Sequence, residues 1–184
     1  TYHSIYINNN GNITFQGPLS TFTPVVIGSN LNFPIIAPYW MDIDTSNRSS
    51  VNPTPGGTST GSNLVYYDLD TITGVLTVTW DDVGSFSGNN SNPNAFQLRL
   101  FSKGDGDFDI EFRYEAINSF TGSIFGVARA GFSWGRRFGE NEQVLPPITS
   151  EIPGSGVGSQ ILLLDEPTTP TNTGIPGVWR FNVV

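Results

Sequence analysis

The chain has 184 residues, no cysteine and one histidine, and its 16 acidic residues outnumber the 8 basic ones to give a net charge of -8. The lack of cysteine excludes disulfide frameworks, thiol catalysis and cysteine-ligated zinc. The negative charge argues against sequence-independent binding to nucleic acid and against docking on an anionic membrane. The longest apolar run, residues 161–164, is too short for membrane insertion.

Short windows of alternating apolar and polar residues follow one another along the chain, separated by Gly, Pro, Asn and Asp. This pattern is typical of strands and turns. The predicted strands are residues 4–8, 12–16, 35–40, 64–69, 75–80, 95–101, 108–114, 128–133, 160–164 and 178–183. Residues 46–62 and 135–158, which are rich in Gly and Pro, are predicted to be long loops.

Ten short strands in a chain of this size predict one all-β domain over residues 1–184, an antiparallel β-sandwich with long loops. A domain of this length buries enough apolar surface to fold without a disulfide or a required metal. We therefore expect the isolated domain to be a monomer. Asn-Gly at residues 10–11 predicts a tight hairpin between the first two strands.

A second hairpin is predicted around Gly104. Folding the chain at that residue places Leu98 opposite Ile110 on an apolar face and Arg99 opposite Asp109 on a polar face. In this register the acidic residues of the second strand, including Glu111, are solvated partners on an outer face. This role is favoured over catalysis.

Eight segments in a fixed order carry a resemblance to a known family. They are IYIN at 5–8, GNITF at 11–15, IAPYWMDIDT at 36–45, LVYY at 64–67, VTWDDVG at 78–84, NAFQL at 94–98, ARAGFS at 128–133 and GIPGVWRF at 174–181. Together they resemble the nidogen-like (NIDO) extracellular domain over nearly the whole chain. The resemblance implies a secreted or cell-surface location, a role in cell–matrix adhesion or matrix assembly, and no catalytic motif.

The chain departs from vertebrate members of that family by a longer insertion after residue 45 and by loops rich in Asn, Thr and Ser. These loops and the lack of cysteine suit a bacterial surface protein. We expect the domain to belong to a larger extracellular protein.

Asp42 and Asp44 stand two residues apart just after a predicted strand, so an extended backbone would direct both carboxylates to one side. Ca²⁺ prefers several oxygen ligands, and Asn47 in the following loop is a third candidate ligand. The competing explanation, which is favoured, is that both carboxylates accept hydrogen bonds from backbone amides and Thr45 at the corner between strand and loop.

Three other acidic pairs have simpler explanations. Those at residues 68/70 and 105/107 lie at predicted turns, where Asp is common. Asp81 and Asp82 are neighbours on a strand and are expected to point to opposite faces, which makes them a poor chelating pair.

The four tryptophans divide into two groups. Trp40, Trp80 and Trp179 lie within or at the end of apolar alternations and are predicted to be buried. Trp134 instead precedes a loop that contains Arg136, Arg137 and Phe138. Aromatic residues and Arg dominate binding interfaces, so this stretch is the predicted partner-binding site; the alternative is a loop that covers an edge of the sandwich.

An enzymatic role is the least favoured hypothesis for this chain. With His3 as its one histidine, the chain is a poor candidate for a Ser-His-Asp triad, and no pair of carboxylates is placed as a glycosidase requires. We predict a non-catalytic extracellular module that binds a matrix protein or glycan through loops on a β scaffold. The alternative is a carbohydrate-binding module attached to a larger secreted enzyme or adhesin. No cofactor is required, and Ca²⁺ is the one candidate ion.

Overall fold

The computed structural model describes residues 3–28, 31–46, 51–121, 126–135 and 149–183. These residues form β1 (Tyr6–Asn8), β2 (Asn12–Thr14), β3 (Ile35–Trp40), β4 (Leu64–Asp70), β5 (Val75–Ser85), β6 (Asn89–Gly104), β7 (Asp107–Ile117), β8 (Arg129–Ser133), β9 (Thr149–Glu151), the 3-10 helix η1 (Gly158–Leu164) and β10 (Val178–Val183). The prediction of an all-β fold is confirmed.

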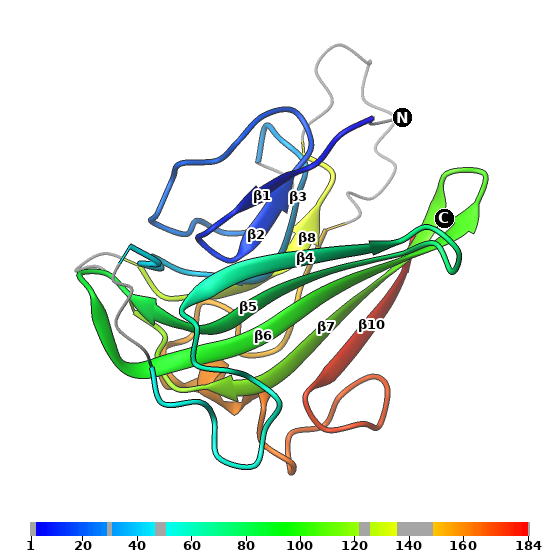
Figure 1. Ribbon diagram of the computed structural model, residues 1–184. Coiled ribbons are helices and arrows are strands. Elements are labelled where there is room, and N and C mark those ends of the chain that lie inside the picture. Colours follow the sequence, from blue (N-terminus) through cyan, green and yellow to red (C-terminus); the bar gives the residue numbers. More distant parts are fainter. Residues whose placement is uncertain (1–2, 29–30, 47–50, 122–125, 136–148, 184) are drawn as a thin grey trace.

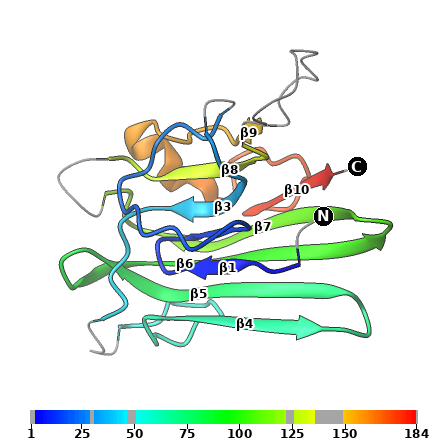
Figure 2. The same cartoon turned by 90° about the horizontal axis from the view of Figure 1, so that it is seen from above.

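The strands form two antiparallel sheets of five strands each. The small sheet has the order β1-β2-β3-β8-β9, and the large sheet has the order β10-β7-β6-β5-β4. Figures 1 and 2 show the long strands of the large sheet fanning out beside one another, with the small sheet and η1 packed on one face. The large sheet therefore has an inner face, which contributes to the core, and an outer face that the small sheet leaves uncovered.

The core lies between the sheets because inward-facing residues alternate with outward-facing ones along each long strand. Trp80 and Phe96, which are paired across β5 and β6, stack with ring centroids 5.1 Å apart, and Tyr39 of the small sheet lies 5.5 Å from Phe96. Trp40, Trp80 and Trp179 are all buried, as predicted. Burial of these large side chains accounts for much of the stability of a fold that has no disulfide.

The hairpin between β6 and β7 has the predicted apolar face but a different register. Leu98 pairs with Phe112 and Arg99 pairs with Glu111, so the strands are shifted by two residues from the predicted alignment. The physical reason is the turn together with a bulge beside it. Asp105 and Gly106 both have positive φ and form the two-residue connection from Gly104 to Asp107, and the irregularity between Ser102 and Gly104 brings the shift to two residues. A shift of two residues preserves which face each side chain occupies.

Two further predictions were wrong. Residues 160–164 are not a strand but part of η1, in which Ile161 and Leu164 are buried and Leu163 is half exposed. Their spacing of three residues matches the 3-10 repeat, and so short an apolar run does not distinguish strand from helix. The predicted loop at residues 135–158 contains β9, a three-residue edge strand that pairs with β8 and carries little apolar signal.

Candidate functional site

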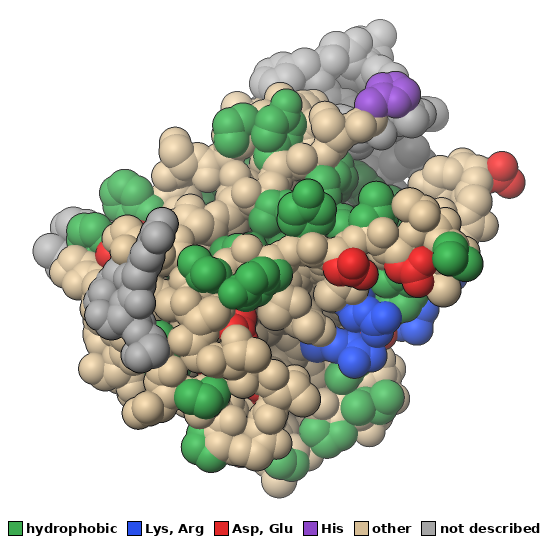
Figure 3. All heavy atoms as spheres, in the orientation of Figure 1, with side chains coloured by type: hydrophobic (Ala, Val, Ile, Leu, Met, Phe, Trp, Pro, Cys, Tyr) green, Lys and Arg blue, Asp and Glu red, His purple; other side chains and the backbone are tan. Residues whose placement is uncertain are grey.

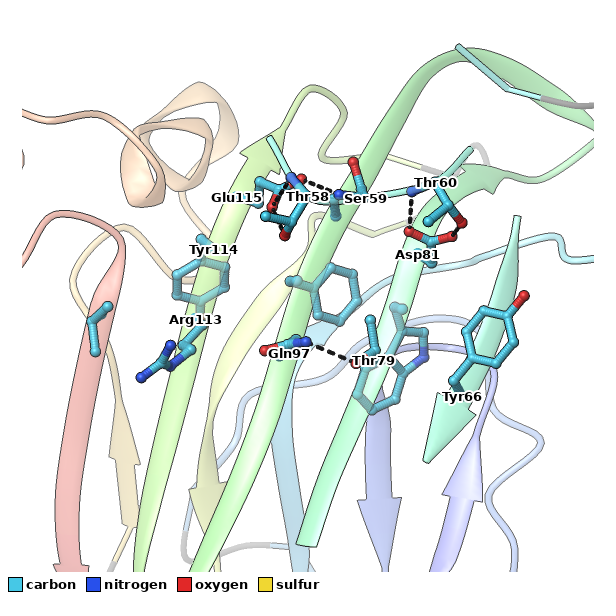
Figure 4. Close-up of a pocket in the computed structure, with 14 residues that line it drawn as sticks. Thr58, Ser59, Thr60, Tyr66, Thr79, Asp81, Gln97, Arg113, Tyr114 and Glu115 are labelled. Atoms are coloured by element: carbon cyan, nitrogen blue, oxygen red, sulfur yellow. Dashed lines mark hydrogen bonds between the residues drawn. The ribbon is translucent and has the colours of Figure 1, made fainter. Parts of the chain in front are cut away.

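A groove of about 660 Å³ lies on the outer face of the large sheet. Its floor is a row of side chains that are paired across the strands: Tyr66 on β4, Thr79 on β5, Gln97 on β6, Arg113 on β7 and Val178 on β10. Figure 4 shows the first four of these residues, with the amide of Gln97 donating a hydrogen bond of 2.9 Å to the hydroxyl of Thr79. Tyr66 is 49% exposed, so its ring is available to a ligand.

The loop of residues 54–62 borders this groove, with Thr58, Ser59 and Thr60 among the lining residues. Glu115 binds two of them: its carboxylate accepts the backbone N–H of Thr58 at 2.8 Å, the Thr58 hydroxyl at 2.7 Å and the backbone N–H of Ser59 at 2.8 Å. Asp81 accepts the Thr60 N–H at 2.8 Å and the Thr60 hydroxyl. The loop is thus attached to the sheet by charge-assisted hydrogen bonds, which are stronger than neutral ones.

Asp82 extends the same attachment. Its carboxylate accepts the N–H of Gly61 at 2.9 Å and the hydroxyl of Thr54 at 3.1 Å. The prediction that Asp81 and Asp82 point to opposite faces was therefore wrong. A β-bulge causes this, because the register shifts between Trp80 and Val83 and Asp82 takes a positive φ of 48°.

The carboxylates of Asp81 and Glu115 in the groove both accept hydrogen bonds from the loop of residues 54–62. Burial raises the pKa of Asp81, but hydrogen bonds from Ser62 and Thr60 outweigh this effect and place the pKa below its usual value. Burial also raises the pKa of Glu115, but the hydrogen bonds from Thr58 and Ser59 lower it by more, so the pKa lies below its usual value. A general acid at neutral pH needs the opposite shift, so neither carboxyl suits that role.

A cluster of cations continues the groove along the same face. The chain has eight Lys and Arg residues, of which Arg48, Arg136 and Arg137 lie outside the described residues. Four of the remaining five, here called the cation cluster, project from β6, β7 and β10: Arg99, Lys103, Arg113 and Arg180. Figure 3 shows basic side chains gathered in one patch on this side of the molecule.

Asp109 and Glu111 on β7 form the ion pairs that hold the cation cluster together. Asp109 lies 2.7 Å from the ammonium of Lys103 and 3.1 Å from the guanidinium of Arg180. Glu111 lies 2.6 Å from Nε of Arg113, and its other contacts are with Arg99 at 3.4 Å and Arg180 at 3.8 Å.

The side chains of Asp109 and Glu111 are only 9% and 6% exposed, so the description of these residues as solvated was wrong. The long side chains of the cations cover them. The hydrogen bond from Lys103, helped by the charge of Arg180, keeps the pKa of Asp109 below its usual value despite the opposing effect of burial.

The predicted calcium ligands lie in a different part of the fold. Asp44 accepts the backbone N–H of Ser46 at 2.9 Å and that of Gly88 at 3.0 Å. The carboxylate thus acts at a corner between loops, as the favoured explanation states, although the neighbouring hydroxyl donor is Ser46 and not Thr45. Asp42 is buried. Asn47 lies outside the described residues.

Among the residues that the structure describes, no three His, Cys, Asp or Glu side chains are grouped so that they could hold a metal. Calcium binding at Asp42, Asp44 and Asn47 stays a prediction.

Only the first residue of the predicted partner-binding stretch is described. Trp134 is half-buried at the edge of the core, with its ring edge-on to that of Phe108 at a centroid distance of 5.9 Å. This position favours the alternative in which Trp134 covers an edge of the sandwich. Arg136, Arg137 and Phe138 lie outside the described residues, so binding by this stretch stays a prediction.

Neither the groove nor the cation cluster was predicted from the sequence, although the pattern of polar residues indicates that both lie on one face of the sheet. On β6 and β7 the residues with polar side chains occupy alternate positions, which include Gln97, Arg99, Glu111 and Arg113. All five strands of the large sheet carry such residues on one face, but which of them meet depends on register. The bulge at Asp81 and Asp82 interrupts the alternation, because the buried residues Trp80 and Val83 stand three residues apart. The alternation does not show, however, that the carboxylates of both bulges turn toward one loop.

No helix in the described part of the chain is long and apolar enough to cross a membrane. No solved structure is significantly similar to the chain. The model of the nidogen-like domain family matches residues 3–184.

Among curated proteins, the chain is 30% identical to alpha-tectorin from Mus musculus over 99% of this chain and 9% of that protein. It is 30% identical to dendrite extension defective protein 1 from Caenorhabditis elegans over 99% of this chain and 15% of that protein. With nidogen from Drosophila melanogaster the identity is 28%, over 99% of this chain and 14% of that protein. The chain thus spans a small fraction of the length of these relatives. It belongs to the nidogen-like (NIDO) domain family and is an extracellular domain.

Proposed function

We propose that this domain is a non-catalytic binding module that serves cell–matrix adhesion or matrix assembly, and that its contact surface is the outer face of the large sheet. The observation that carries the proposal is the groove, whose floor takes side chains from all five strands. Loops and faces held on a rigid scaffold are where binding residues concentrate.

The chemistry of the groove supports binding over catalysis. Its two carboxyl groups, Asp81 and Glu115, each accept several hydrogen bonds from the bordering loop. Neither has the raised pKa that would keep it protonated for acid catalysis at neutral pH. The remaining floor residues, Tyr66, Thr79 and Gln97, offer a ring, a hydroxyl and an amide, which are groups that contact and orient a ligand.

A second candidate function is a carbohydrate-binding module attached to a larger secreted enzyme or adhesin. The exposed ring of Tyr66 beside the hydroxyl of Thr79 and the amide of Gln97 favours it, because a sugar ring can stack on the aromatic ring and hydrogen-bond to its polar neighbours. A catalytic domain elsewhere in the parent protein would favour this candidate over the adhesion module.

The test is retention of the labelled domain on detergent-extracted extracellular matrix. We expect Tyr66→Ala combined with Gln97→Ala to reduce retention at least tenfold with little change in Tm, because Tyr66 is half exposed and Gln97 lies on the outer face. The comparison variant is Arg136→Ala with Arg137→Ala, which removes the cations of the other predicted contact. Full retention of the groove variant together with loss in the arginine variant would move the contact surface to residues 134–138.

A further inference from the structure

The outer face of the large sheet presents positive charge although the chain carries a net charge of -8. The side chains of Arg113, Arg180 and Lys103 are 46%, 44% and 41% exposed, whereas those of their counter-ions Asp109 and Glu111 are 9% and 6% exposed. A molecule approaching this face therefore meets guanidinium and ammonium groups first. Four cations above two carboxylates also leave the cluster with an excess of positive charge.

The cations are held in place before any ligand binds. The guanidinium carbons of Arg99 and Arg180 lie 4.7 Å and 4.5 Å from the ring centroid of Phe101, so the ring is flanked by both. Ion pairs to Glu111 restrain Arg99 and Arg113 as well. Restraining these long side chains in advance lowers the conformational entropy that binding costs.

We propose that the groove and the cation cluster together form a binding site for an anionic glycan, with a sugar ring on Tyr66 and the carboxylate or sulfate groups of the glycan on the cation cluster. Arg113 joins the two parts, because it lines the groove and belongs to the cluster. Its Nε is engaged by Glu111, and a guanidinium has two further nitrogens that can donate to an oxyanion. This inference rests on the proposed function and names the ligand class for the same surface.

The lining of the groove favours a glycan over an acidic peptide. Peptides are commonly bound by pairing with a free strand edge or by apolar pockets that take anchor side chains. The groove instead runs over the side chains of paired strands, and its outward-facing floor is hydroxyl, amide, guanidinium and one aromatic ring, with Val178 at one end. Such groups match the hydroxyls and rings of a sugar chain.

Acidic residues limit the site on the β4 side. Asp68 lies in the same cross-strand row as Arg99 but is separated from it by β5, and Asp70 lies two residues further along β4. The cation cluster is therefore confined to β6, β7 and β10.

The test is calorimetric titration of the folded domain with four polymers: heparin fragments, which carry sulfates and carboxylates; polygalacturonate, which carries carboxylates alone; uncharged dextran; and poly-glutamate. We expect heparin or polygalacturonate to bind, with an affinity that falls as NaCl is raised. A preference between these two identifies sulfate or carboxylate as the recognised group. Equal binding of dextran, or tighter binding of poly-glutamate, would overturn the assignment to an anionic glycan.

Two variants locate the site. Lys103→Gln with Arg113→Gln is expected to weaken the binding of the better anionic glycan at least tenfold. Arg129→Gln is the matched control: Arg129 is the remaining described cation, it pairs with Glu151 on the small sheet, and its removal should leave affinity unchanged. Equal losses per charge removed would reduce the effect to net charge and overturn the site.

If the double variant has a lowered Tm, Tyr66→Ala gives the decision, because that exposed side chain can be removed without disturbing the ion pairs. Unchanged affinity of Tyr66→Ala would then overturn the site. Failure of all four polymers to bind, in a domain that is still retained on extracellular matrix through the groove, would overturn the glycan assignment and leave the proposed function standing.

Discussion

Asp81 and Asp82 are consecutive residues of β5, yet both carboxylates accept hydrogen bonds from the same loop of residues 54–62. Two residues of β5 at this point oppose Ala95 of β6, which defines a β-bulge. A matching irregularity places Glu115 of β7 on the other side of Ala95. Three carboxylates from two bulges thus attach one loop beside the groove, and we call Asp81, Asp82 and Glu115 the clamp.

Replacing Asp81 with Ala should lower the free energy of unfolding by about 2–3 kcal/mol, because the partly buried hydrogen bonds from the N–H groups of Thr60 and Ser62 lose their charged acceptor. For a chain of this size the corresponding fall in Tm is roughly 4–12 °C. Asp70→Ala is the control, since Asp70 also accepts hydrogen bonds from Ile72 and Thr73, but these bonds are exposed to solvent. Similar changes in Tm for the two variants would contradict the clamp.

The clamp also predicts how stability depends on pH. The pKa values of Asp81 and Glu115 are lowered in the folded protein, so their stabilising contribution is complete above the unfolded pKa values of about 4 and is lost as pH falls through the lower folded values. Urea unfolding at pH 7 and at pH 3 should therefore show a smaller difference in unfolding free energy for Asp81→Asn than for the unmodified domain. An equal difference would assign the acid sensitivity to other groups.

The contribution of Asp165 to stability should change with pH in the opposite direction. Burial raises its pKa even though its carboxylate accepts the backbone N–H of Ile117 at 2.8 Å. The ionised form is thus disfavoured in the fold, and this penalty grows as pH rises through the unfolded pKa and then the folded pKa. Asp165→Asn keeps an acceptor oxygen for Ile117 and is expected to leave stability at pH 7 equal or higher. A marked loss of stability at pH 7 would contradict this assignment.

Gly11 lies in the turn between β1 and β2, where its backbone packs closely against β3. Its φ is +78°, and a Cβ at this position would lie 1.8 Å from the carbonyl oxygen of Tyr39, which is backbone and cannot rotate away. We expect Gly11→Ala to prevent stable folding or to lower Tm far more than Gly104→Ala. Gly104 has a similar φ of +85° but open space around it, so that variant costs about 1–2 kcal/mol from the backbone conformation alone. Thermal unfolding of both variants measures the difference.

Glu111 is expected to organise the cation cluster more than it stabilises the fold. Glu111→Gln removes the charge that Arg99, Arg113 and Arg180 share, but these cations are 27–46% exposed and can be solvated by water. We expect a loss of about 1–2 kcal/mol, below the value typical for a fully buried pair. The readout is urea unfolding; a loss well above this range would show that the cluster is a main source of stability.

The domain is expected to fold as a monomer without metal, because its core is built from large aromatic and aliphatic side chains. Treatment with EDTA should leave Tm unchanged. Addition of millimolar Ca²⁺ tests the predicted ligands Asp42, Asp44 and Asn47, and a rise in Tm that is lost in Asp44→Asn would support them. Unfolding by the chelator would contradict the first expectation, and the lack of any calcium effect would end the second.

Most of the fold could be predicted from the sequence because alternation of side chains reports which residues face inward. Nine of the ten predicted strands occur, and the inward positions of Leu98, Ile110 and Phe112 are correct. Register was not predictable to the same degree, since a shift of two residues keeps every side chain on its face. The site depends on register and on bulges: Arg113 meets Gln97, and Glu115 meets the loop, only in the observed alignment.

The most direct test of the account is a titration of the isotope-labelled domain with a short heparin fragment, followed through the amide resonances. Binding of the glycan to the groove and the cation cluster would place the largest shifts at residues that share the outer face of the large sheet: Tyr66, Gln97, Arg99, Arg113 and Arg180. Shifts confined to residues 134–138 would contradict it by placing the contact on the other predicted surface.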